Sequence, residues 1–131
     1  RVHYNIKKLM IELSASYQYT RAIDIEKSEN PQLIYIPGHT TGNHLMISYG
    51  RASIMVQHML AGERFVDAEN TQTLPWYQVV NINTILNIGR KNRTSVLLNL
   101  YNITNEHYES VLYYPMPGIS FRIGIRLALN A

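Results

Sequence analysis

The chain has 131 residues, of which 46% are hydrophobic and 16% are charged, and its formal net charge at pH 7 is +3. This apolar content excludes a disordered chain, and the mild charge, without a run of like charges, argues against a nucleic-acid partner. The absence of cysteine excludes disulfides and thiol chemistry. Ten Tyr residues stand against two Phe and one Trp. Tyrosine suits a boundary between apolar and aqueous surroundings, because its ring is apolar and its tip is polar.

Apolar and polar residues alternate most clearly at positions 9–23. One face would carry Leu9, Ile11, Leu13, Ala15, Tyr17, Tyr19 and Ile23, interrupted by Arg21, and the other Met10, Glu12, Ser14, Ser16, Gln18, Thr20, Ala22 and Asp24. A period of two predicts a β-strand with one apolar and one polar face. The same pattern recurs at 2–6, 44–49, 54–60, 80–88, 95–100 and 121–130. We therefore expect about seven strands, several of them long enough to cross a membrane at a tilt.

The connections between these strands alternate in length. The links near 7–8, 50–52 and 90–93 are short, whereas those at 24–39, 66–75 and 104–118 are long and rich in turn-forming residues. In an up-and-down antiparallel sheet, this order places all short turns at one end and all long connections at the other. Outer-membrane barrels sort their connections in this way, and soluble sandwiches do not.

The last strand has the strongest two-faced pattern. Phe121, Ile123, Ile125, Leu127 and Leu129 share one face, and the opposite face carries Arg122, Arg126 and Asn130. A soluble β-sandwich predicts the same alternation, because its apolar face is its core. Strand length, the sorting of the connections and aromatic residues near the strand ends (Tyr17, Tyr19, Tyr49, Trp76 and Tyr77) favour a membrane. We therefore expect an all-β fold, a transmembrane up-and-down antiparallel β-barrel.

Three stretches resemble one family, the TonB-dependent outer-membrane receptors. They are Leu33–His39 (LIYIPGH), Gly62–Phe65 (GERF) followed by Leu74–Tyr77 (LPWY), and Asn99–Tyr108 (NLYNITNEHY) followed by Tyr114–Phe121 (YPMPGISF). The family usually has Arg where this chain has Ile119. The three stretches occur in the family's order over almost the whole chain.

The resemblance implies a barrel of 22 strands around an N-terminal plug domain. Residues 1–131 would be its C-terminal part, about seven strands, with the plug and the remaining strands absent from this chain. It implies a protein of the cell outer membrane that takes up a scarce nutrient, with TonB acting through the plug. Cobalamin is the favoured ligand, and ferric siderophores or haem are alternatives. Whether a surface lipoprotein caps the barrel is left open.

Four residues of the last long connection are candidate ligand contacts: His107, Tyr108, Tyr113 and Tyr114. The five histidines (His3, His39, His44, His58 and His107) form no paired ligand motif, and Asp67, Glu69 and Asn70 lack the spacing of an EF-hand. We therefore expect neither a metal nor a cofactor. No catalytic constellation is visible, so an enzyme is not expected. Two other classes remain, a passive outer-membrane pore and a soluble ligand-binding β-sandwich.

Overall fold

A computed structural model describes residues 1–6, 8–27, 31–88 and 94–128. Its main feature is one antiparallel sheet of seven strands in the order β1-β2-β3-β4-β7-β8-β11. These strands are β1 (Val2–Ile6), β2 (Leu9–Tyr19), β3 (His39–Tyr49), β4 (Ala52–Ala61), β7 (Tyr77–Ile88), β8 (Thr94–Tyr101) and β11 (Ser120–Leu127). Two small ladders complete the fold: β5 (Arg64–Phe65) pairs with β6 (Thr73–Leu74), and β9 (Glu109–Val111) pairs with β10 (Tyr114–Pro115).

The all-β fold and the seven predicted strands are confirmed, with shifted boundaries. The strand predicted at 9–23 ends at Tyr19. Its ladder with β3 ends at the pair Tyr19 and His39. One further backbone bond follows in the same register, from the Thr20 amide to the Gly38 carbonyl at 2.8 Å, and the chain then continues as a loop with one isolated bridge, Ile23 to Gln32. The end of the predicted last strand, from residue 129 on, lies outside the described residues, as does the whole turn predicted at 90–93.

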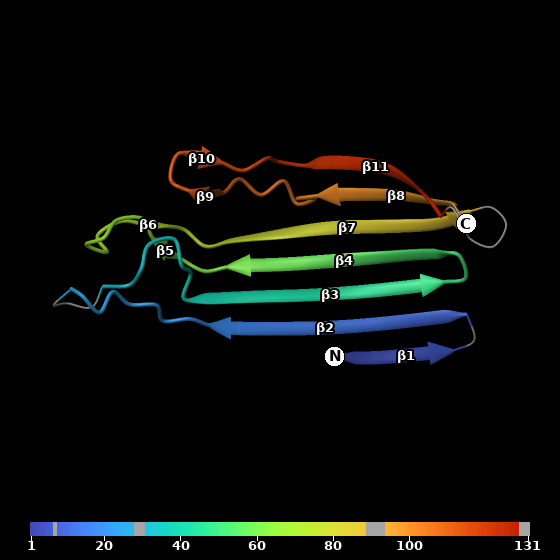
Figure 1. Cartoon of the computed structure of the whole chain (residues 1–131), viewed down its shortest axis with the longest axis horizontal. Coiled ribbons are helices and arrows are strands. Elements are labelled where there is room, and N and C mark those ends of the chain that lie inside the picture. The colour runs from blue at the N-terminus through green and yellow to red at the C-terminus, as the bar shows by residue number, and fades with distance from the viewer. Residues whose placement is uncertain (7, 28–30, 89–93, 129–131) are drawn as a thin grey trace.

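The predicted sorting of the connections is also present. The long connections 20–38, 62–76 and 102–119 lie at one end of the sheet, on the left in Figure 1, and the strand ends joined by short turns lie at the other. Between β3 and β4 the turn is as short as a hairpin allows, with Tyr49 paired to Ala52. Gly50 adopts a φ of +58° in this turn, a conformation that glycine reaches without the steric cost of a side chain.

One face of the sheet is apolar along continuous rows of paired residues. One row crosses all seven strands as Val2, Leu13, Leu45, Val56, Ile82, Leu100 and Phe121. The next row toward the short turns is Tyr4, Ile11, Ile47, Ile54, Thr84, Leu98 and Ile123. We call this side of the sheet the apolar face. Because side chains alternate between faces along a strand, the register places all the intervening residues on the opposite, polar face.

The polar face is a network of hydrogen bonds between neighbouring strands. Ser48 and Ser53 share a hydrogen bond between their hydroxyls at 2.8 Å, and the Ser95 hydroxyl bonds the Asn87 side-chain oxygen at 2.8 Å. Glu12 is buried on this face, and Arg1 bonds its carboxylate. The two sides of the sheet therefore differ in chemistry as the alternation predicts.

Within the described residues the chain has almost no interior. Three apolar side chains are buried, those of Ala61, Leu74 and Val79. The accessible surface is 9664 Å², whereas a compact folded monomer of 15.1 kDa exposes about 7,100 Å². No closed barrel forms, because β1 and β11 are the two edges of the sheet. Across the part of the chain that the structure describes, no helix has the length and apolar character needed to span a membrane.

Candidate functional site

The three long connections meet at one end of the sheet and are tied together by side chains. The most buried of these ties is Arg64, at 4% exposure on β5. Its guanidinium donates hydrogen bonds to the carbonyl of Pro75, at 3.1 Å, and to the carbonyl of Glu109. Because Glu109 belongs to the third connection, Arg64 joins that connection to the second.

Aromatic stacking extends this tie. The Arg64 guanidinium lies over the Tyr77 ring at 5.0 Å from its centroid, and Tyr77 stacks on Tyr108 with ring centroids 4.1 Å apart. Burial raises the pKa of the Tyr108 hydroxyl, with a smaller contribution from Tyr77. Tyr77 therefore packs inside this cluster on the polar face, and it does not join an aromatic belt on the apolar face as its position in the sequence suggested.

Two asparagines build the base of the third connection. Asn102 is 3% exposed, and its side chain donates to the carbonyls of Glu106 (2.9 Å) and Pro117 (3.1 Å) and accepts from the Glu106 amide (2.9 Å). The Asn105 side-chain oxygen accepts from the Ile119 amide at 3.1 Å. A Cβ on Gly118 would lie 2.6 Å from that oxygen. The two asparagines therefore bond the residues on either side of Gly118, Pro117 and Ile119, and the absence of a side chain on Gly118 leaves room for the Asn105 oxygen.

The four predicted contact residues separate into two pairs. His107 and Tyr108 line a hollow of about 310 Å³ together with Leu74, Pro75, Glu109, Pro115 and Met116. Tyr113 and Tyr114 lie outside this hollow at the tip of the β9–β10 hairpin and are 80% and 70% exposed. Tyr113 has a φ of +65°, and its amide donates to the Glu109 carboxylate at 2.9 Å. These two rings would meet a ligand at the outer surface of the connections.

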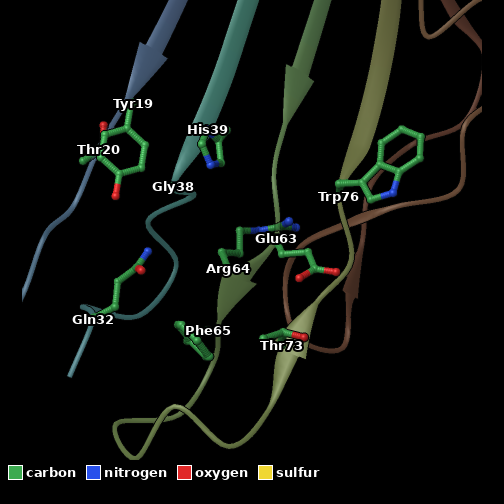
Figure 2. A pocket seen from close by; sticks show the side chains of 10 residues that line it. All are labelled: Tyr19, Thr20, Gln32, Gly38, His39, Glu63, Arg64, Phe65, Thr73 and Trp76. Carbon is green, nitrogen blue, oxygen red and sulfur yellow. The ribbon is translucent and has the colours of Figure 1, made fainter.

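A second hollow, of about 430 Å³, lies between the ends of β2 and β3 and the β5–β6 ladder (Figure 2). In this view Tyr19 and Gln32 lie on one side and Trp76 on the other, with Glu63 between. The His39 ring packs against Tyr19 with centroids 5.1 Å apart, and its Nδ1 atom hydrogen-bonds the Tyr17 hydroxyl at 2.8 Å.

Rings and polar groups of this kind suit a ligand that has both apolar and polar surfaces. The sequence reasoning did not assign these residues to a ligand. His39 and Trp76 were singled out as parts of family-like stretches, which was the signal available for this hollow.

Asp67 organises the tip of the second connection. Its carboxylate accepts hydrogen bonds from the Thr71 hydroxyl (2.7 Å) and from the amides of Thr71 and Gln72. These bonds, the Thr71 hydroxyl first, hold the pKa of the Asp67 carboxyl below its ordinary value. The Asn70 side chain bonds both the amide and the carbonyl of Gln32, at 2.6 and 2.9 Å, and so ties the second connection to the first. The side-chain oxygens of Asp67 and Asn70, two of the three residues considered for calcium, are thus engaged with the protein itself.

The histidines are dispersed. His3 and His44 approach the Glu12 carboxylate on the polar face, each at 3.5 Å. His58 lies on the apolar face, and His39 and His107 belong to different hollows. Among residues 1–6, 8–27, 31–88 and 94–128, no group of three or more His, Cys, Asp or Glu side chains is arranged to hold a metal ion.

By its architecture the chain is an all-β protein with one seven-stranded antiparallel sheet, whose long connections lie together at one end. In the comparisons with known proteins, no family model matches the chain and no curated protein matches it.

Proposed function

We propose that this chain is the C-terminal part of the transmembrane β-barrel of a TonB-dependent outer-membrane receptor. The observation that carries the proposal is the apolar face, whose paired rows run across all seven strands and are not covered by a second layer of the described residues. An apolar surface of this extent requires a cover, and lipid is a cover that spans the full width of such a sheet.

The exposed area supports lipid as the cover. The accessible surface exceeds that of a compact monomer of the same mass by about 2,600 Å². A sandwich would bury its apolar face against a second sheet, but the other ladders of the described chain have two strands each and lie in the long connections. The geometry therefore favours a membrane protein over the soluble sandwich.

The few polar side chains that lie on the apolar face are also arranged as lipid surroundings require. The Asn43 side-chain nitrogen lies 3.2 Å from His58 Nδ1, and His58 Nε2 lies 3.1 Å from the Gln78 side-chain oxygen. This chain of hydrogen bonds crosses three neighbouring strands, β3, β4 and β7. Unpaired polar groups are costly where no water is available, so mutual pairing is the arrangement that lipid requires.

The function within this class follows from the family-like stretches and the two hollows. We propose energy-coupled uptake of a scarce nutrient, with cobalamin favoured over a ferric siderophore or haem. His107, Tyr108, Tyr113 and Tyr114 would contact the ligand from the third connection. The TonB complex would act through a plug domain outside this chain, and the remaining barrel strands would pair with β1 and β11.

The test uses the full-length protein. Membranes containing it should release it only with detergent, and cells should accumulate labelled cobalamin in a TonB-dependent manner. Accumulation of a ferric siderophore or haem instead would change the substrate and keep the class. Uptake independent of TonB would indicate a passive pore, and a protein that is soluble without detergent would contradict the membrane assignment.

A further inference from the structure

The second hollow contains a carboxylate that has no cationic partner within the described residues. Glu63 is exposed there, and in Figure 2 its side chain lies between Gln32 on one side and Trp76 on the other. The ion pairs within the described residues all involve Glu12, which lies on the polar face away from this hollow. The second hollow therefore presents a negative charge to whatever enters it.

Arg64 also lines the second hollow, but its donors are used within the protein. Its guanidinium bonds the carbonyls of Pro75 and Glu109 and lies over the Tyr77 ring. The wider surroundings are acidic: among the described residues, the long connections contain seven Asp or Glu residues and three Lys or Arg residues. The field at this end of the sheet therefore favours a cation over an anion.

Three aromatic side chains line the same hollow, those of Tyr19, His39 and Trp76, and the first and last are 61% and 54% exposed. Tyr19 and His39 are paired across β2 and β3, and Trp76 directly precedes β7. Because β2, β3, β4 and β7 are successive neighbours, the rings are spread over about 14 Å. Aromatic rings attract cations to their faces and pack against apolar groups. The lining therefore suits an extended ligand with a cationic group and an apolar part.

We propose that the second hollow binds an organic ammonium ion, with its charge against Glu63 and Trp76 and its apolar part toward His39 and Tyr19. A carboxylate accepts charge-assisted hydrogen bonds from an ammonium group, and an indole face attracts the same charge. A metal ion suits the site less well, because no group of three or more His, Cys, Asp or Glu in the described chain is arranged to hold one. A soluble amine and the ethanolamine headgroup of a phospholipid share this chemistry. The inference goes beyond the proposed uptake and does not depend on which nutrient is carried.

The test is calorimetric titration of the full-length protein in a neutral detergent with phenethylammonium and 2-phenylethanol, which differ in the charged group. Glu63→Gln should weaken phenethylammonium binding about ten-fold or more and leave phenylethanol binding unchanged. Trp76→Leu should weaken phenethylammonium binding about two- to five-fold. Both side chains are exposed, so neither substitution should prevent folding. Glu69→Gln is the matched control, because it removes the same charge from an exposed residue of the same connection outside the hollow.

Equal affinity for the ammonium and the alcohol would overturn the proposal, and so would an equal loss in the Glu69→Gln control. Tighter binding of a neutral disaccharide such as maltose, unchanged by Glu63→Gln, would indicate a saccharide site and would also overturn it. Displacement of phenethylammonium by short-chain phosphatidylethanolamine would support the site and identify lipid as a source of its ligand. These outcomes are distinct from failure of the proposed uptake, because a protein that binds the ammonium through Glu63 but accumulates no nutrient loses only the uptake.

Discussion

Ile54 and Met59 offer a matched pair for testing which face of the sheet meets lipid. Both lie on β4, the central strand, both are 46% exposed, and they point to opposite faces. Ile54 lies within the apolar rows, between Ile47 and Thr84, whereas Met59 lies beside Gly42 on the polar face. In water, an Arg at either position would change the free energy of unfolding by no more than about 0.5 kcal/mol, as at other exposed sites.

In a bilayer the two substitutions should diverge. An Arg on the lipid face costs about 2–4 kcal/mol at the middle of the membrane and about 0–1 kcal/mol near its interfaces. Ile54 is the third residue of β4 from the short turn, so Arg there should cost about 1–2 kcal/mol, which lowers the folding equilibrium constant roughly 5- to 30-fold. Ile54→Arg should show this loss, and Met59→Arg should stay near the parent protein. The assay is reversible urea unfolding of the full-length protein in lipid vesicles, followed by tryptophan fluorescence. Equal effects of the two substitutions would refute the assignment of the apolar face to lipid.

Three further predictions concern the long connections. Asn102→Ala should lower the free energy of unfolding by about 1–2 kcal/mol, because it leaves the part-buried backbone groups of Glu106 and Pro117 without their side-chain partner. Asn102→Gly should be milder by about 1 kcal/mol, because Asn102 has a φ of +49°. Urea unfolding measures both, and a larger loss for Gly than for Ala would contradict this account. Arg64→Lys should lower the free energy of unfolding by about 1–3 kcal/mol, because lysine cannot donate to both carbonyls while lying flat on the Tyr77 ring. The same unfolding assay measures this loss, and a protease should cleave the third connection faster in the variant. Unchanged cleavage would count against the role of Arg64 in joining the two connections. The pKa of Asp67 is lowered in the folded chain, so the Asp67 carboxylate stabilises the second connection fully above the ordinary carboxyl pKa, and this stabilisation is lost as the pH falls through the lowered value. The NMR signals of the Thr71 and Gln72 amides should therefore titrate with a midpoint below that of an ordinary aspartate. Asp67→Asn should remove this transition.

Strand positions and faces were predictable because they depend on a local signal. Residues 11–19 alternate without a break, and the paired rows follow once each strand has a single apolar face. The boundaries were less accurate, because β2 ends where its pairing with β3 ends, at Tyr19 opposite His39, and this pairing joins residues 20 positions apart. The two-residue strands β5, β6 and β10 were missed, since alternation cannot be recognised over so short a segment.

The candidate site was predictable only in part. His107 and Tyr108 were expected to lie together because they are neighbours in one connection, and they line one hollow. The stack of Arg64, Tyr77 and Tyr108 joins two connections, and no local pattern encodes such a contact. The second hollow likewise depends on how three separate strand ends approach one another, as Figure 2 shows for Tyr19, His39 and Trp76.

The number of strands in the sheet restricts how a barrel could close. Every neighbouring pair among the seven strands is antiparallel, so β1 and β11 run in the same direction. Direct closure, or a ring of identical copies around the barrel axis, would therefore bring two parallel strands together at each seam. A fully antiparallel barrel that contains this sheet must draw an odd number of additional strands from elsewhere, and its total must be even.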